Sequence, residues 1–360
     1  MKKKIMALVL VLAVVAVMCG LAACAASGSQ GGGSGLVAVF MPTKSLQRWN
    51  QDGANMEKEL KAKGYAVDLL YAEDTVATQI SQVETEINKK PKVMVVASID
   101  SEALIPVLDK ASAAGIKIIA YDRLLMKTKS CDYYATFDNY MVGQMQGKFI
   151  EDKLGLKTNK GPFNIELFIG SPDDNNAKLF NKGAMDVLQP YIDSKVLVVK
   201  SGQVDFATIA IPGWKSETAQ KRMDALLTAN YGNAKLDAVL SPNDSLAQGI
   251  AASLSSKGYG TADKPYPVLT GQDCDINSVK NIIAKKQSMS ILKDTRILAK
   301  RAATMADQII KGGTVETNNN TYDNGVKIVP TFLCDIQFAD INNWQKLLVD
   351  SGYYTADQLK

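Results

Sequence analysis

The chain has 360 residues, of which 46% are hydrophobic, 22% charged and 7% aromatic, and this composition is typical of a globular protein. A chain of this length is expected to form two domains with separate cores. The sequence contains no histidine, which excludes Ser-His-Asp and Cys-His nucleophiles, histidine-ligated metals and a histidine pH switch. The formal charge of +4 falls to +1 without the lysines at positions 2–4. No basic surface for nucleic acid is therefore expected.

The N-terminus has the features of a signal peptide. The three lysines precede an apolar run at residues 5–18, which is too short for a comfortable membrane span. The sequence LAAC at 21–24 is similar to a lipoprotein box, in which small residues precede a cysteine that is acylated before cleavage. We expect a signal peptide at 1–23, lipidation of Cys24 and a flexible Gly/Ser-rich tether at 24–35. A plain secretory signal is the alternative.

Three further cysteines follow, Cys131, Cys274 and Cys334, with no paired spacing and no CxxC motif. Neither a disulfide framework nor a zinc site is indicated. We expect these residues to behave as small buried apolar side chains.

Short apolar runs alternate with helix-patterned segments from residue 36 onward, which predicts βαβ units and parallel sheets. A first set of strands is predicted at 36–41, 67–71, 93–97, 116–121 and 134–137, and a second set at 164–169, 196–200, 238–240, 267–270 and 289–292. Helices are predicted between them, for example at 47–63, 79–89 and 101–114, each stopped by Gly or Pro. So many strands predict two sheets, and therefore two doubly wound α/β domains.

Polar clusters follow strand after strand, including YDR (121–123), GSPDDNN (170–176), SPND (241–244), GQD (271–273) and KD (293–294). Ligands of open α/β sheets bind at the carboxyl ends of the strands. No Gly-rich phosphate loop occurs at the first strand–helix turn, so a nucleotide is not expected, and no cofactor is implied. A single polar residue at a strand end is more often a helix cap or a turn residue than a ligand contact, and this interpretation is favoured for Asp174 and Asp244.

These clusters suit a neutral polyhydroxyl ligand, because hydroxyl groups both donate and accept hydrogen bonds. The apolar face of a sugar ring also favours contact with an aromatic ring. Trp49 follows Arg48 at the start of the first predicted helix, and Trp214 precedes another helix. Both tryptophans are candidates for such contacts.

The order of motifs resembles the periplasmic monosaccharide-binding proteins of bacterial ABC importers, of the multiple-sugar-binding and xylose-binding type. The resemblance covers essentially residues 36–349. It rests on PTKS…RW (42–49), YAED (71–74), ASID (97–100), IAYDRL (119–124), YYATFDN (133–139), GPFNIELF (161–168), GSPDDNNA (170–177), LQPYIDS (188–194), SPND (241–244), GYGTADKP (258–265), GQD (271–273), KDTR (293–296) and TYDNGVKIVP (321–330).

The resemblance implies a sugar site and no enzyme activity. Trp49 and Trp214 would stack on the sugar, while the polar contacts would come from Arg48, Asp122, Arg123, Asn175, Asn176, Asn243, Asp273 and Lys293. It further implies the periplasmic binding protein type I fold, with a three-segment hinge joining residues 36–138 plus 294–320 to residues 139–293 plus 321–360. Closure around a pentose or hexose would present an extracytoplasmic monomer, held at the membrane through Cys24, to an ABC permease and its ATPase.

The sequence also allows other functions. A lipoprotein that presents its closed form to a chemoreceptor or sensor kinase would use the same site. A glycosidase would need two carboxylates such as Asp122 and Asp273, and a nucleoside-binding lipoprotein is a further alternative. The signal segment and the missing helix-turn-helix exclude a repressor.

Overall fold

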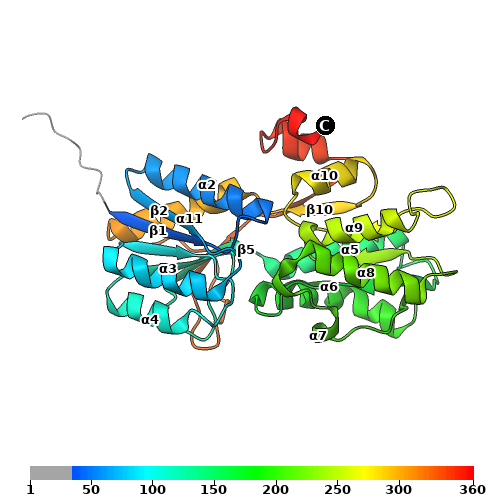
Figure 1. Cartoon of the computed structure of the whole chain (residues 1–360), viewed down its shortest axis with the longest axis horizontal. Helices are drawn as coiled ribbons and strands as arrows, with labels where there is room; N and C mark the ends of the chain where they lie inside the picture. Colours follow the sequence, from blue (N-terminus) through cyan, green and yellow to red (C-terminus); the bar gives the residue numbers. More distant parts are fainter. Residues whose placement is uncertain (1–34) are drawn as a thin grey trace, which may run out of the picture.

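The computed structural model describes residues 35–360. The predicted signal peptide, the predicted lipidation site Cys24 and tether residues 24–34 lie outside the described residues. The described part forms two α/β lobes side by side (Figure 1). No helix within it is both long and apolar enough to cross a membrane.

The first lobe is built on one sheet of six parallel strands in the order β11-β5-β4-β3-β1-β2. The strands are β1 (Leu36–Met41), β2 (Ala66–Tyr71), β3 (Val93–Val96), β4 (Lys117–Tyr121), β5 (Tyr133–Phe137) and β11 (Thr331–Cys334). One face packs against α2 (Gln47–Ala62) and α11 (Thr295–Ile310), the other against α3 (Val76–Lys89) and α4 (Ile105–Ala113). Because helices cover both faces, the central strands are continuous apolar runs.

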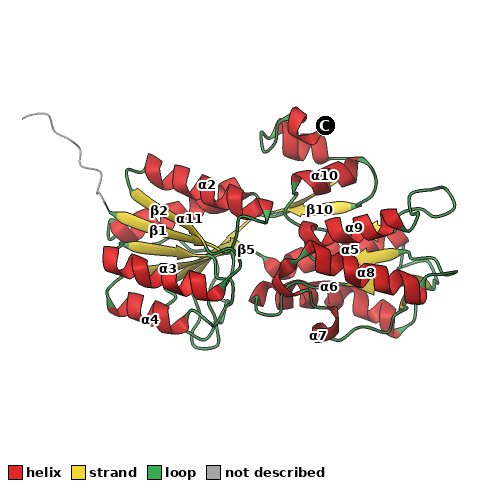
Figure 2. Cartoon of the chain, viewed as in Figure 1, coloured by secondary structure: helices red, strands yellow, loops and turns green. Residues whose placement is uncertain are grey.

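The second lobe has a parallel sheet of four strands in the order β7-β6-β8-β9, with helices on both sides (Figure 2). The strands are β6 (Phe163–Leu167), β7 (Leu197–Val199), β8 (Ala238–Leu240) and β9 (Val268–Leu269). The helical segments are α5 (Asn139–Leu154), α6 (Asn175–Asp193), α7 (Phe206–Ile209), the 3₁₀ turn η1 (Pro212–Trp214), α8 (Ser216–Asn230) and α9 (Asp244–Ser256). The prediction of two parallel-sheet α/β domains is confirmed.

The last part of the second lobe differs from the prediction. Residues 289–292 were expected in the second parallel set, but β10 (Met289–Leu292) pairs antiparallel with β12 (Gln337–Asp340). A parallel bridge between Gln272 and Ile291 connects this pair to the larger sheet. Helix α10 (Ile276–Ile283), the π-helical turn η2 (Gln345–Asp350) and the 3₁₀ turn η3 (Ala356–Leu359) pack beside it.

The chain passes between the lobes at three places. The first lies between β5 and α5, the second between β10 and α11, and the third between β11 and β12. Residues 321–360 were expected in the second domain, yet β11 pairs with β5, with Thr331 opposite Tyr134. The third crossing therefore follows Cys334, and residues 321–334 belong to the first lobe.

Polar residues at several strand ends cap the helices that follow. The side chains of Asp138, Asp174, Asn243 and Asp294 each accept a hydrogen bond from a backbone N–H in the first turn of the next helix. The cap role expected for Asp174 is thus confirmed. Elsewhere in the fold, the three cysteines of the described residues are buried and unbridged, as expected.

Candidate functional site

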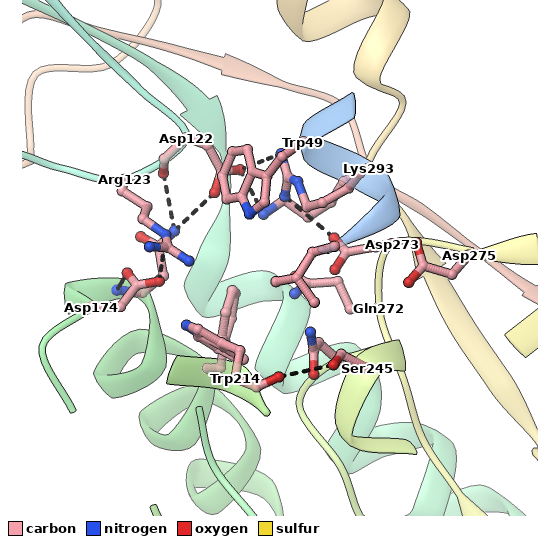
Figure 3. A pocket seen from close by; sticks show the side chains of 15 residues that line it. Trp49, Asp122, Arg123, Asp174, Trp214, Ser245, Gln272, Asp273, Asp275 and Lys293 are labelled. Carbon is pink, nitrogen blue, oxygen red and sulfur yellow. Dashed lines mark hydrogen bonds and ion pairs between the residues drawn. The ribbon is translucent and has the colours of Figure 1, made fainter. Parts of the chain in front are cut away.

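A small cavity of about 30 Å³ lies between the lobes, where strand ends of both sheets meet (Figure 3). The first lobe lines it with Leu46, Arg48, Trp49, Asp122 and Arg123. The second lobe and the segment between the lobes contribute Asp174, Asn176, Phe180, Trp214, Asn243, Ser245, Gln272, Asp273, Asp275 and Lys293.

Two indole rings form opposite walls of the cavity. Trp49 lies in the first turn of α2, and Trp214 lies in η1 on the other side of the cavity (Figure 3). The ring of Trp214 packs edge-to-face on Phe180, with centroids 6.3 Å apart, and it lies directly against Gly170, where any Cβ would overlap it. Both tryptophans also belong to the hydrophobic cores of their lobes. Their ring positions are therefore fixed by packing.

Arg48 connects carboxylates of both lobes. Its Nη2 atom lies 2.9 Å from Asp52 Oδ2 and 3.1 Å from Asp122 Oδ2, and its Nη1 atom lies 3.3 Å from Asp273 Oδ1. The guanidinium also stacks on Trp49, 4.3 Å from the ring centroid. Arg48 is only 6% exposed. The Arg48 side chain therefore links two carboxylates of its own lobe, Asp52 and Asp122, to Asp273 in a loop of the second lobe.

Asp122 is the centre of this network. Lys293, at the end of β10, places its Nζ 2.8 Å from Asp122 Oδ2. The backbone of Asp122 has a positive φ of 58°, which is uncommon for a residue other than glycine. Its carbonyl oxygen accepts hydrogen bonds from Tyr134 Oη at 2.6 Å and from Asn176 Nδ2 at 3.0 Å. These bonds stabilise the turn and aim the carboxylate at the cavity.

A second ion pair crosses between the lobes. Arg123 Nε lies 2.9 Å from Asp174 Oδ2, and Arg123 Nη1 donates to the carbonyl oxygen of Ser98 at 3.0 Å. Asp174 also caps α6 by accepting from the backbone N–H of Asn176 at 2.9 Å. The same carboxylate therefore caps a helix and positions a guanidinium.

The buried carboxyl groups titrate over a wide range of pH. Burial tends to raise the pKa of Asp122, but the cations Arg48 and Lys293 outweigh burial and lower it to about 2. Burial raises the pKa of Asp52 to about 6 in spite of Arg48, and Tyr121 Oη donates to this carboxyl. Burial together with the neighbouring Asp273 charge raises the pKa of Asp275 to about 7. Asp122 is therefore ionised at neutral pH.

Some polar atoms of the lining have no hydrogen-bond partner among residues 35–360. Apart from Arg48 Nη2 and Asp122 Oδ2, which form ion pairs, these are the indole Nε1 atoms of Trp49 and Trp214, and the acceptors Gln272 Oε1 and Asp275 Oδ1. Buried polar groups normally find partners. The cavity thus offers two donors and two acceptors to a ligand. No cluster of three potential metal ligands occurs in the described part of the chain.

The structure brings together nine of the ten residues predicted from the sequence: Arg48, Trp49, Asp122, Arg123, Asn176, Trp214, Asn243, Asp273 and Lys293. Asn175 is the exception, because it lines a separate surface groove with Asp138 and Tyr322. Consecutive helical residues point about 100° apart, so at the start of α6 Asn176 turns toward the cavity and Asn175 turns away.

Six lining residues were not predicted: Leu46, Asp174, Phe180, Ser245, Gln272 and Asp275. Gln272 directly precedes Asp273, Asp275 lies two residues after it, and Phe180 follows Asn176 by one helical turn. Their positions relative to the predicted residues could have indicated these three side chains from the sequence. Asp244, interpreted as a structural residue, does not line the cavity and accepts from Gln287 at 2.9 Å.

Comparisons with known proteins identify the family of this chain. A family model for the periplasmic binding protein domain matches residues 37–314. The chain is 53% identical over 324 residues to the multiple sugar-binding periplasmic protein SbpA of Azospirillum brasilense, covering 90% of this chain and 91% of the relative. It is 54% identical over 327 residues to the multiple sugar-binding periplasmic receptor ChvE of Rhizobium radiobacter, covering 91% and 92%.

A solved structure from Clostridium phytofermentans, an ABC transporter solute binding protein with bound β-D-glucose, is 56% identical to this chain. Its TM-score is 0.88, and the match covers 90% of this chain and all of that one. These relatives are solute-binding proteins rather than enzymes, which argues against the glycosidase alternative. The chain belongs to the periplasmic binding protein family.

Proposed function

We propose that this protein captures a neutral monosaccharide in the cavity between its lobes. The observation that carries the proposal is the pair of indole rings on opposite walls, with unpartnered donors on the rings and unpartnered acceptors on Gln272 and Asp275. Aromatic faces suit the C–H faces of a sugar ring, and mixed donors and acceptors suit its hydroxyl groups. The glucose-bound relative, at 56% identity, supports the same class of ligand.

The residue roles follow from charge and position. Trp49 and Trp214 stack on the two faces of the sugar. Asp122 and Asp273 accept from its hydroxyl groups, and Arg48, which contacts both carboxylates, orients them and donates to the ring or hydroxyl oxygens. The remaining polar contacts come from Arg123, Asn176, Asn243 and Lys293.

We further propose that the lobes close around the sugar and deliver it to an ABC permease. The three crossings between the lobes supply a hinge that permits rigid-body closure. Presentation of the closed form to a chemoreceptor or sensor kinase is the second candidate function. It is supported by the relative ChvE, which is described as a periplasmic receptor. Deleting the genes of the partner permease separates the two functions, since only import is then lost.

The sugar is identified by a calorimetric panel of arabinose, xylose, glucose, galactose, fucose and ribose. We expect at least one of them to bind with a dissociation constant below 0.1 mM, that is, roughly −5.5 kcal/mol or better. Adenosine serves as the control for a nucleoside site. Tight adenosine binding without any sugar binding would overturn the proposal.

We also propose that the mature protein is extracytoplasmic and anchored through lipid on Cys24, because LAAC at 21–24 follows an apolar segment. In the native host, Cys24→Ser should leave the precursor uncleaved or release the protein from the membrane fraction. Mass spectrometry of the wild-type N-terminus gives the direct test. A wild-type chain without lipid at Cys24 would contradict the anchor while leaving sugar binding untouched.

A further inference from the structure

The C-terminal segment 351–360 lies over the junction of the lobes, above α10 in Figure 1. Its residues Tyr354 and Leu359 pack in a cluster with Cys274 and Val279, so the segment belongs to the second lobe. Neither Tyr354 nor Leu359 lines the cavity. The neighbouring α2 of the first lobe begins at Gln47, one residue before Arg48.

The hydroxyl group of Tyr354 joins the two lobes. It donates to the carbonyl oxygen of Cys274 at 2.9 Å and accepts from Gln47 Nε2 at 2.7 Å and from Gln51 Nε2 at 3.3 Å. Tyr354 is only 3% exposed. The hydrogen bonds are therefore formed away from bulk water, and opening of the lobes would break those to α2.

Gln47 makes a second contact across the junction. Its Oε1 atom accepts from the backbone N–H of Ile276 at 3.1 Å, while its Nε2 atom donates to Tyr354. Both ends of one first-lobe amide are thus bound by second-lobe partners. We call these contacts of Gln47, Tyr354, Cys274 and Ile276 the interlobe latch.

The latch is joined to the cavity wall through the backbone. Asp273 and Cys274 both have positive φ angles, 97° and 51°, a conformation that needs support from its surroundings. Tyr354 donates a hydrogen bond to the carbonyl oxygen of Cys274, and the backbone N–H of Cys274 donates to Ser290 Oγ at 3.0 Å. Asp273, one residue earlier, contacts Arg48. The latch therefore holds the loop that carries a cavity carboxylate.

We propose that Tyr354 is a positioning residue for sugar binding, which sets the lifetime of the closed complex without touching the sugar. This inference rests on the proposed function. Loss of its hydroxyl group removes the hydrogen bonds from Gln47 and Gln51 of α2, which exist only when the lobes are closed, and leaves the bond between Gln47 and Ile276 in place. The change should speed opening, and therefore sugar dissociation, while association by open molecules is unaffected.

The test is stopped-flow fluorescence with glucose on the full chain, because two of its three tryptophans line the cavity. We expect Tyr354→Phe to raise the dissociation rate constant about threefold to tenfold, the range for one net hydrogen bond. The association rate constant should stay within twofold of wild type. A dissociation rate within 1.5-fold of wild type would overturn the inference.

Tyr231→Phe is the matched control. Tyr231 is also 3% exposed, and its hydroxyl donates to Glu166 at 2.7 Å inside the second lobe. This variant should lower the melting temperature and leave the dissociation rate constant unchanged. An equal acceleration in both variants would show that lost stability, rather than the latch, speeds dissociation.

A double variant separates the latch from independent packing effects. Gln47→Leu should speed dissociation by itself, and the combination with Tyr354→Phe should give less than the product of the two effects, because the residues share a bond. Multiplicative effects would refute the latch. Wild-type protein that binds neither glucose nor any other sugar of the panel would instead refute the proposed function.

Discussion

Replacing Asp122 by Asn should destabilise the ligand-free protein through Lys293. The side chain of Lys293 is 1% exposed, and its ion-pair partner within residues 35–360 is Asp122, at 2.8 Å. Arg48, by contrast, keeps Asp52 and Asp273 when Asp122 loses its charge. The substitution therefore leaves one buried ammonium group without a counter-charge.

Two considerations give the magnitude. The pKa of Asp122 falls from its ordinary value of 3.8 to about 2 in the folded chain, which corresponds to about 2 kcal/mol of stabilisation. Because the folded pKa is lowered, this stabilisation is present above pH 3.8 and is lost as the pH falls toward 2. Removing one partner of a buried pair costs roughly 3–5 kcal/mol, since the other charge stays buried. We therefore expect Asp122→Asn to lower the free energy of unfolding by about 3 kcal/mol at pH 7.

The assay is urea unfolding at pH 7, followed in parallel by tryptophan fluorescence and circular dichroism so that two-state behaviour is checked. Lys293→Met in the Asp122→Asn background should restore part of the lost stability, because it removes the unpaired charge. If the double variant instead loses the sum of the two single losses, the two groups are not coupled and the reasoning is refuted.

Three further predictions concern the walls and the acid cluster. Gly170→Ala should weaken glucose binding at least tenfold in calorimetry, because the new Cβ overlaps the ring of Trp214 and must displace it. Unchanged affinity would show that this ring does not contact the sugar. Trp49→Ala should lower both glucose affinity and the free energy of unfolding, the latter by about 3 kcal/mol, because Trp49 is 2% exposed in the first-lobe core. Asp275→Asn should raise the melting temperature at pH 8 but not at pH 4, because a folded pKa raised from 3.8 to about 7 makes ionisation cost stability progressively between these pH values and fully above pH 7. A uniform shift at both pH values would contradict the assignment.

Much of the fold follows from local patterns in the sequence. The continuous apolar runs of β1 and β3 predicted buried parallel strands, and Gly64 ends α2 with a positive φ of 88°. Strand β11 was missed, because its partner β5 lies almost two hundred residues earlier in the chain. The pairing of β10 with β12 depends in the same way on contacts that a local pattern does not encode.

The site was predicted more completely than the sheets, and for a physical reason. Parallel sheets place every strand end at one edge, so the polar clusters after β4, β6, β8 and β9 had to converge. What sequence reasoning missed depends on side-chain direction. Asn175 and Asn176 differ by one helical step, and Asp174 was treated as a cap when it both caps α6 and binds Arg123.

The charges of the cavity explain why a ligand would decide whether the lobes close. Three cations line it, Arg48, Arg123 and Lys293, with four carboxyl groups, Asp122, Asp174, Asp273 and Asp275. The pairs Arg48–Asp273 and Arg123–Asp174 join opposite lobes, so closure removes these charges from water. The desolvation cost of a buried pair is comparable to its Coulomb attraction. Closure by these pairs alone is thus nearly balanced. Under the proposed function, the additional contacts of a sugar with the two indole rings and the unpartnered polar atoms would shift the equilibrium to the closed form.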